Sequence, residues 1–295
     1  MSLTLADAAK LATDVLVQGV IETVVKDSDV LARLPFADIV GNSLSYNREN
    51  AAASAAFYSV GDTWTESTPT ITHVTTALVI LGGDADVDNY IRQTRQNVQD
   101  IEAAILELKA KAVRHKFEDT FINGAVATDA KSFDGIDTLC TAGQTLEMAT
   151  NGAALTVAKL DTMIDLVMGG KPDLLLMSKR SRRKLKALRI AGGSVLESDT
   201  DSYGKRLNFY DGIPIGVSDW ISDTQTHGNT STNSTIYAMS FGEGALLGLQ
   251  GGGGMQVERL GSLETKDATR TRIKWYISLA LLSTLKLAKL TGVQD

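Results

Sequence analysis

The feature that most constrains this fold is an unusually long helical segment. Between Asp86 and Asn123 the sequence contains neither proline nor glycine, and Gly124 follows directly. We predict one uninterrupted helix over residues 86–122, which at 1.5 Å per residue would span about 55 Å and exceed the usual globular helix. Asp86 and Asp88 place negative charge at its amino end, and Asn123 with Gly124 predicts a left-handed stop. A helix this long needs a layer or a partner chain along its side.

The apolar residues of this helix leave two interpretations open. A seven-residue repeat, typical of a coiled coil, is formed by Ile91, Val98, Ile105 and Ala112. The second heptad position holds Thr94 and His115, and polar residues there weaken such a seam. A helix that packs one face on a sheet accommodates them at least as well. We therefore favour packing on a sheet and keep a coiled-coil interaction protein as the alternative.

The segment before the helix predicts a projecting hairpin. Residues 44–84 begin and end with strand-like stretches, and the second, "ITHVTTALVIL", is rich in β-branched residues. Between them, residues 49–70 are small and polar and contain few large apolar side chains to fold onto a core. An isolated hairpin is marginally stable in water, so its value must lie in contacts with another chain. The candidate anchors of that interface are its aromatic residues, Phe57, Tyr58 and Trp64.

The second half of the chain predicts a mixed α/β arrangement. "PDLLLM" (residues 172–177) is typical of a buried strand, and Ser178 is placed to cap a helix that continues to Ile190. Further strands are predicted in "GIPIGVSDW", "TIYAMSFG", "MQVERL" and "TRTRIKWYISLALL", the last with alternating polar and apolar residues.

The helix after Ser178 is strongly basic. Lysine and arginine dominate residues 179–189. Such a run binds nucleic acid, contacts an acidic neighbouring subunit or faces solvent, and we favour the last two because an isolated charge run is usually solvated. Arg180, Arg182 and Arg183 are our candidates for a subunit interface.

Composition excludes several classes of function. The chain has 295 residues, a net charge of -6 and one cysteine, Cys140. The acidic balance disfavours a sequence-reading nucleic-acid binder and gives no reason to expect a membrane partner. One cysteine excludes an internal disulfide and any multi-cysteine metal site. The sequence lacks an apolar run of about eighteen residues and a secretion signal, so we expect a protein made in the cytoplasm.

No catalytic, cofactor or metal site is expected from the sequence. His73, His115 and His227 lack ligand spacing and form no recognisable nucleophile–base pattern. "QGGGGMQ" (residues 250–256) lacks the lysine and the Ser/Thr of a phosphate-binding loop, so we predict a flexible turn between two strands. A nucleotide-binding enzyme that uses these glycines is a disfavoured alternative.

Taken in order, these elements resemble the major capsid proteins of tailed bacteriophages, the Hong Kong 97-like fold family. "KPDLLLMSKRSRRKLKALRIAGG" is similar to the strand and helix of the family's axial domain, and "RLNFYDGIPIGVSDW" is similar to the strand that follows. "IYAMSFGEGALLGLQGGGGMQVE" resembles the return to the peripheral domain, and "TRIKWYISLALLSTLKLAKLTG" resembles the closing strands. The resemblance covers essentially the whole chain and rests on the ordered combination of these motifs.

The resemblance implies an α+β fold in four parts. These are the amino-terminal arm (1–43), the extended β-hairpin loop (44–84), the peripheral domain (85–132 and 245–283, with the spine helix at 86–122) and the axial domain (133–244 and 284–295). Within the first part, apolar residues at helical spacing predict an amphipathic helix over residues 5–27.

The resemblance also implies a function. Many copies would self-assemble through pentamers and hexamers into the icosahedral head shell of a virion, formed in the host cytoplasm. The shell would enclose double-stranded DNA without sequence-specific binding, and the chain would need no cofactor and catalyse no reaction. Since no long scaffolding region precedes the amino-terminal arm, scaffolding is expected to be either a separate protein or unnecessary. Separate portal and cement proteins are further candidate partners.

The sequence differs from some members of the family in one respect, and the same fold also allows one alternative function. Some members join their subunits by an isopeptide bond from a lysine of the extended loop, and no lysine lies between Leu44 and Asp88. That bond is therefore expected to be absent. The rival is an encapsulin nanocompartment, which shares the fold and encloses cargo enzymes.

Overall fold

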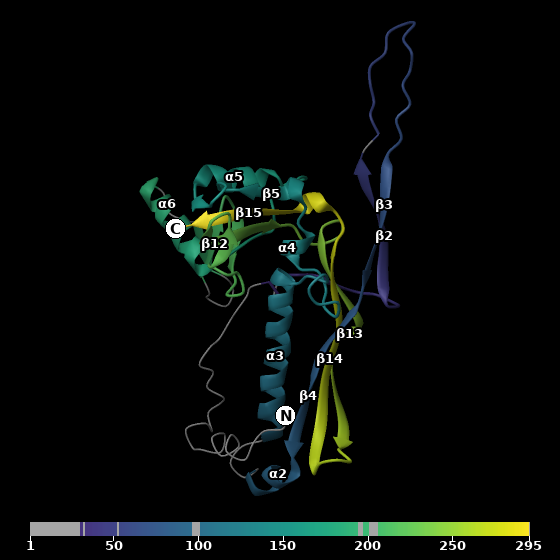
Figure 1. Ribbon diagram of the computed structural model, residues 1–295, viewed down its shortest axis with the longest axis vertical. Helices are drawn as coiled ribbons and strands as arrows, with labels where there is room; N and C mark the ends of the chain where they lie inside the picture. The colour runs from purple at the N-terminus through teal and green to yellow at the C-terminus, as the bar shows by residue number, and fades with distance from the viewer. Residues whose placement is uncertain are drawn as a thin grey trace.

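Figure 1 shows a computed structural model of the chain, an elongated molecule with a hairpin that projects from one end. The structure describes residues 30–31, 33–51, 53–95, 101–193, 197–200 and 206–294. The predicted amphipathic helix over residues 5–27 lies outside the described residues. No helix in the described part of the chain combines the length and the apolar character that crossing a membrane requires.

Strands are the main secondary structure of the described residues. They occur in the second half of the chain, as expected, and also in the first half, where β1 to β4 precede the long helix. The helices, including two short 3-10 helices (η), are α2 (Asn89–Arg95), α3 (Ile101–Asn123), α4 (Ile136–Leu139), η2 (Ala142–Gln144), α5 (Val157–Asp165), α6 (Lys179–Ala191) and η3 (Thr284–Lys286). The strands are β1 (Phe36–Asp38), β2 (Ser43–Ala51), β3 (Thr70–Ala77), β4 (Val79–Asp88), β5 (Thr145–Glu147), β6 (Ala153–Ala154), β7 (Leu174–Met177), β8 (Glu197–Thr200), β9 (Arg206–Tyr210), β10 (Ile213–Val217), β11 (Gln225–His227), β12 (Thr230–Met239), β13 (Leu246–Ser262), β14 (Ala268–Leu281) and β15 (Leu287–Gln294).

The strands of the described residues pair into two sheets and one separate hairpin. The lower sheet of Figure 1 has the order β1-β13-β14-β4, and α3 runs along one of its faces. The upper sheet has the order β5-β15-β12-β7-β10-β9-β8, with β11 beside β12 and β6 beside β15. The hairpin consists of β2 and β3. This mixture of helix and strand confirms the predicted α+β class.

One apolar core joins the two sheets. Phe117 and Phe121 of α3 are fully buried in a cluster with Trp275 of the lower sheet and with Leu174 and Tyr237 of the upper sheet. The ring centroids of Phe117 and Trp275 lie 5.1 Å apart. Tilted aromatic pairs at this separation contribute attraction beyond the area that they bury. The contact therefore holds α3 against the lower sheet at the point where the upper sheet begins.

The strand predicted in "PDLLLM" is confirmed as β7, at the centre of the upper sheet. Leu174 and Leu176 belong to the core shared with α3, whereas Leu175 and Met177 belong to a second core beneath α5 and α6. A strand that is covered on both faces needs a continuous apolar run rather than an alternating one. Ser178 follows and caps α6 with its side-chain oxygen, also as predicted.

The long helix begins later than predicted. β4 continues to Asp88 and pairs with β14 along its length, so Asp86 and Val87 lie in a strand. Asp86 forms an ion pair with Arg270 of β14 instead of facing a helix terminus. Asp88 alone acts as expected, since its carboxylate accepts a hydrogen bond of 2.8 Å from the backbone N–H of Tyr90. Pairing across the sheet has overridden the local helix preference.

The helical residues that follow are described in two pieces, α2 and α3, and residues 96–100 between them lie outside the described residues. The buried side of α3 includes Val113, Phe117 and Phe121, which pack inside the same chain. Ile91 and Ile105, which a coiled-coil seam would present to a partner helix, pack against Val87 of β4 in the same chain. The expected packing of α3 on a sheet is therefore confirmed, and the same residues are not free to form a coiled-coil seam.

The helix ends at Asn123, one residue beyond the predicted end at 122, and the predicted left-handed stop is wrong. Gly124 is absent from the described residues of positive φ, and its N–H donates to the carbonyl of Thr120 at 2.8 Å. A Cβ at Gly124 would lie 2.4 Å from the carbonyl oxygens of both Thr120 and Phe133. Glycine is required here by the close approach of two backbone segments, not by its conformational freedom.

The prediction for the glycine run is also corrected. Residues 251–254 lie inside β13 rather than in a turn between strands. The register changes between the pairs Gly251–Tyr276 and Gln256–Lys274, so β13 carries extra residues there that β14 does not match. Three of the four glycines have positive φ, between 68° and 95°. Together these features define a bulge that bends one long strand.

The projecting hairpin is confirmed. β2 and β3 pair antiparallel from Ser43 and Ala77 at the root to Ala51 and Thr70, and the chain beyond them extends away from both sheets (Figure 1). Residues 79–84, which the sequence assigned to the loop, lie in β4 of the lower sheet. The name "arm" is used below only for the described residues of the range 43–77, and not for the predicted amino-terminal arm (1–43).

We predict that Gly124→Ala destabilises the protein by about 1–3 kcal/mol, because the added methyl group would overlap two backbone oxygens that cannot move independently. Urea denaturation followed by circular dichroism measures the change. Gly143→Ala is the matched control, since a Cβ there meets nothing within 4 Å. Equal midpoints for the two variants would show that the backbone at Gly124 is looser than described.

Candidate assembly surfaces

The root of the arm is fastened to the end of the lower sheet. The hydroxyl of Tyr46 donates to the carbonyl of Leu281 at 2.9 Å, and Arg48 Nε donates to the carbonyl of Leu282 at 3.2 Å. The guanidinium of Arg48 also bonds the carbonyl of Leu281 and lies 5.8 Å from the ring of Tyr46. These bonds give the arm a defined direction, so it projects as a structured element and not as a loose loop.

The tip of the arm is ordered by contacts within itself. The rings of Tyr58 and Trp64 stack with centroids 4.2 Å apart and planes inclined by 21°. The hydroxyl of Tyr58 accepts a hydrogen bond of 3.3 Å from the N–H of Thr65, and the carboxylate of Asp62 accepts one of 2.6 Å from the N–H of Ser59. Two of the three predicted aromatic candidates are thus brought together.

The same tip leaves large apolar surface in water. Phe57 and Val60 are fully exposed, and Trp64 is 76% exposed despite its stacking on Tyr58. Aromatic side chains that are held in place before binding lose little conformational entropy when they become buried. The arm tip therefore has the composition and the order of one half of an interface.

The basic helix α6 separates into internal and surface residues. Arg180 donates to the carbonyl oxygens of Thr232 at 2.8 Å and Val293 at 3.3 Å, and its side chain is 18% exposed. Arg182 and Arg183 are exposed. Arg180 thus contacts its own upper sheet, whereas the other two candidates lie on the surface that a neighbouring molecule can reach.

A set of ion pairs covers the face of the lower sheet that points away from α3. Arg270 donates two hydrogen bonds to Asp86, at 2.6 and 2.7 Å, and Arg272 donates two to Asp84, at 2.7 and 2.9 Å. Paired bonds of this kind match the flat guanidinium to the flat carboxylate. The hydrogen bonds from Arg272 and Arg270 hold the pKa of Asp84 and of Asp86 below the ordinary value of 3.8, although burial acts in the opposite direction.

Sequence reasoning missed these cross-strand pairs. The alternation of Arg272 with apolar neighbours was visible, and it correctly placed Ile273 and Trp275 on the buried face. The sequence pattern that could have revealed the partners of these arginines is the matching alternation of aspartates in "DADVD", residues 84–88. Asp86 and Asp88 were assigned to the start of the helix instead, so the complementary charges of the two strands were not recognised.

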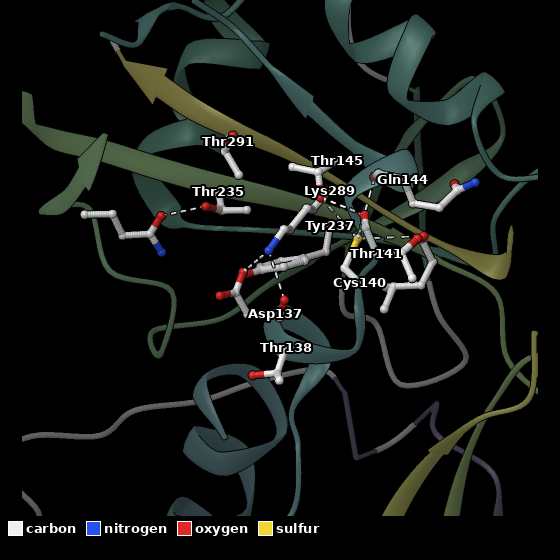
Figure 2. Close-up of polar contacts among 12 residues, drawn as sticks. Asp137, Thr138, Cys140, Thr141, Gln144, Thr145, Thr235, Tyr237, Lys289 and Thr291 are labelled. Carbon is white, nitrogen blue, oxygen red and sulfur yellow. Dashed lines mark hydrogen bonds and ion pairs between the residues drawn. The ribbon is translucent and has the colours of Figure 1, made fainter. Parts of the chain in front are cut away.

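A polar cluster lies beneath the upper sheet, where α4 meets β15 (Figure 2). Lys289 Nζ donates to the carboxylate of Asp137 at 2.8 Å and to its carbonyl at 2.9 Å, and the hydroxyl of Tyr237 donates to the same carboxylate at 3.1 Å. Burial raises the pKa of Tyr237 well above 10 and also raises the pKa of the Cys140 thiol. Both groups therefore stay protonated at neutral pH.

This cluster ties α4 to β15 and is poorly suited to catalysis. A protonated thiol is a weak nucleophile, and the ammonium of Lys289 is engaged by Asp137. A polar pocket of about 320 Å³ adjoins it, lined in part by His227 and Thr235. In the part of the chain that the structure describes, no three His, Cys, Asp or Glu side chains converge as metal ligands.

The predicted contact residues form two separate surfaces. Figure 1 places the arm and α6 on opposite sides of the molecule. A surface on one side of a subunit that binds a different surface on the next generates rings or larger assemblies, rather than closed pairs. Phe57, Trp64, Arg182 and Arg183 are exposed in the single chain, so a neighbour can reach both surfaces.

Comparison with known proteins identifies relatives by family and by fold. A family model described as the phage capsid family matches residues 10–287. The holo-SrpI encapsulin complex from Synechococcus elongatus PCC 7942 has a TM-score of 0.72 and 18% identity, over 100% of this chain and 97% of that one. The capsid of an empty GTA particle has a TM-score of 0.68 and 15% identity, over 93% of each chain. A chain from Mycobacterium phage Bobi has a TM-score of 0.63 and 13% identity over the full length of both. No curated protein matches the sequence.

We predict that the cross-strand pairs make stability fall with acidity. A carboxylate whose pKa is lowered by folding stabilises the folded state fully above its unfolded-state pKa, here the ordinary 3.8, and that contribution is lost as the pH falls through the lowered value. Melting temperatures of the wild type and of Asp84→Asn with Asp86→Asn should differ at about pH 6, and the difference should shrink as the pH falls below 3.8.

Asp211→Asn is the control for this experiment, because it removes a single exposed carboxylate paired with Lys171 at a turn. A gap between wild type and double variant that stays constant down to the lowest pH would contradict the assignment of the acid sensitivity to Asp84 and Asp86.

Proposed function

Since the chain belongs to the phage capsid family, we propose that its copies assemble through pentamers and hexamers into the icosahedral head shell that encloses viral DNA. The family match over residues 10–287 carries this proposal, because it includes the arm, α3, the lower sheet and the strands of the upper sheet other than β15. The chain is a major capsid shell protein with the Hong Kong 97-like fold, as the resemblance implied. The finer statements about capsomers and contents are the proposal.

The division of the chain into working parts is part of this proposal. The peripheral domain (85–132 and 245–283) would form the stiff body of the tile, because α3 and the long β13 and β14 give it an extended shape (Figure 1). The axial domain (133–244 and 284–295) would cluster around the five-fold and six-fold positions. The arm would lie on a neighbouring copy, where its exposed Phe57 and Trp64 become buried.

The net charge of the chain bears on what the proposed shell would contain. A net charge of -6 suits a container into which DNA is driven better than a protein that condenses DNA by binding it. Separate scaffolding, portal and cement proteins would complete the assembly in the host cytoplasm, and the finished shell would be part of the virion. The chain would act through its contacts, without catalysis.

One observation favours a second candidate function. The encapsulin complex has a TM-score of 0.72 with this chain, above the 0.68 and 0.63 of the two capsid chains compared. An identity of 18% shows the shared fold and not the contents of the shell. The alternative is therefore a shell of the same architecture that holds cargo enzymes in a host cytoplasm. Family membership makes it the weaker candidate.

Electron microscopy of the purified protein tests the proposal. Closed icosahedral shells with pentamers and hexamers are expected, and particles from infected cells should contain DNA. Small defined oligomers without shells would refute the assembly function. Shells that contain host proteins and no DNA would instead support the encapsulin alternative.

We predict that replacing residues 50–69 by a short Gly-Ser turn leaves a folded protein that cannot close into shells. Residues 53–69 are almost all exposed, so circular dichroism and melting temperature should stay near those of the wild type. Interface anchors such as its aromatic residues contribute about 2 kcal/mol or more each when truncated. Sedimentation should then show only monomers or capsomers.

The sharper form of this experiment changes the aromatic residues alone. Phe57→Ala with Trp64→Ala should impair closure as the deletion does, whereas Thr63→Ala with Thr68→Ala, at exposed positions of the same segment, should assemble normally. An unfolded deletion variant would mean that the arm belongs to the subunit core, and normal shells from it would mean that the arm is dispensable.

We predict that Arg182→Glu with Arg183→Glu impairs capsomer formation in the absence of nucleic acid. Each exposed ion pair is weak, about 0–1 kcal/mol, but the contact recurs around a ring and reversal turns attraction into repulsion. Native mass spectrometry measures the capsomer population. Lys131→Glu with Lys171→Glu reverses two exposed cations elsewhere and should assemble normally. Normal empty shells that fail only to package DNA would place the two arginines at the DNA instead.

A further inference from the structure

The loop that follows β10 reaches from the upper sheet to the side of α3. The indole N–H of Trp220 donates to the carboxylate of Glu118 at 3.3 Å, and the side-chain amide of Asn123 donates to the carbonyl of Trp220 at 3.2 Å. The ring of His115 packs edge-on against the indole, with centroids 5.9 Å apart. Successive turns of α3 therefore contact one residue of the loop.

The carboxylate at this contact is buried. Glu118 is 1% exposed, and its other oxygen accepts a hydrogen bond of 3.0 Å from Arg114 Nε, one helical turn away. A charge removed from water is costly unless its oxygens are bonded. Arg114 supplies a bond from within the helix, and Trp220 supplies a bond from the loop. Both oxygens of the buried Glu118 carboxylate are therefore bonded only when the loop places Trp220 beside α3.

The same loop is also joined to α6. Lys179 Nζ lies 2.7 Å from the carboxylate of Asp219, and Arg180 Nε lies 3.5 Å from that of Asp223. These aspartates flank Trp220 in the sequence. Residues 218–223 consequently contact α3 through Trp220 and α6 through the two acidic residues.

The shared apolar core, which includes Phe117 and Leu174, is a second contact between α3 and the upper sheet. The helix α4, which follows α3 along the chain, adds hydrogen bonds from Lys289 and Tyr237 to Asp137. Apolar contacts are roughly proportional to buried area and depend little on direction. Hydrogen bonds weaken steeply with angle and distance. The core can therefore hold the two parts together over a small range of angles. The bonds of Trp220 restrict that range along the side of α3, as those of Asp137 do at its end.

We propose that residues 218–223 form a coupling loop that fixes the angle between α3 and the upper sheet, and so fixes the curvature with which copies of the chain close into a shell. Trp220 is the positioning residue. The loop's ion pairs to Lys179 and Arg180 lie next to the exposed Arg182 and Arg183 on α6. A neighbour that binds α6 is thereby linked to the direction of the spine helix. The curvature part of this inference rests on the proposed function.

The test compares two variants that each delete one aromatic hydrogen-bond donor to a carboxylate. Trp220→Phe removes the bond to Glu118 at the junction. Tyr210→Phe removes the bond from Tyr210 to Asp161, which lies within the upper part of the molecule between β9 and α5. Both variants of the full chain are assembled, imaged by electron microscopy and analysed unassembled by hydrogen exchange with mass spectrometry.

Trp220→Phe is expected to lose the uniform particle diameter of the wild type and to form tubes, open sheets or shells of mixed size, whereas Tyr210→Phe keeps the wild-type diameter. In the unassembled chain, the backbone amides of residues 115–123 should exchange faster in Trp220→Phe than in the wild type. In Tyr210→Phe they should exchange at the wild-type rate. Wild-type diameters and exchange in Trp220→Phe, or equal defects in both variants, would overturn the proposal.

Glu118→Gln supplies a second variant if Trp220→Phe does not fold. Glutamine has the size of glutamate, but its amide nitrogen would face a donor, either Arg114 or Trp220, so one junction bond is lost. It should reproduce the faster exchange in residues 115–123, and wild-type exchange would overturn the coupling. A wild type that forms no shells would refute the proposed function alone, because the exchange measurement tests the coupling without assembly.

Discussion

The structure depends on the burial of Phe117, which is fully enclosed where α3 crosses from one sheet to the other. Its ring lies 5.1 Å from that of Trp275, 5.9 Å from that of Phe133 and 6.2 Å from that of Phe36. These rings come from β14, from the segment after α3 and from β1. One side chain therefore organises three distant parts of the sequence around the helix. The arm and α6 can point in fixed directions because they are attached to this rigid centre.

The parts of the fold that the sequence predicted well are those whose signal is local. β7 has a continuous apolar run because both faces of its sheet are covered, and Ser178 is a helix cap in sequence and in structure. The arm was recognisable because its residues lack the apolar side chains that a core requires. Each of these properties belongs to a short window, and no distant residue is needed to interpret it.

The parts that were mispredicted are set by distant partners. Asp86 looks like the first turn of a helix until Arg270, 184 residues away, is placed beside it. Gly124 looks like a left-handed stop until the carbonyl of Phe133 is packed against it. Arg180 is indistinguishable from Arg182 in sequence, yet it is directed at the upper sheet of its own chain. Periodicity shows that such residues are special, but the partner that explains each one comes from the fold.

The contrast between the arm and the coupling loop suggests why a shell protein distributes its interactions in this way. The exposed aromatic residues at the arm tip lie outside the core of the single chain and are buried only when a neighbour covers them, so the subunit can fold first and associate later. The buried bonds of Glu118 are already formed within the subunit, so the shape that the subunit brings to that association is determined in advance. Weak contacts repeated many times let misplaced subunits dissociate before a shell closes. A fixed internal angle then makes one closed geometry more favourable than the many that flexible tiles would allow, and curvature becomes a property that residues inside each copy encode.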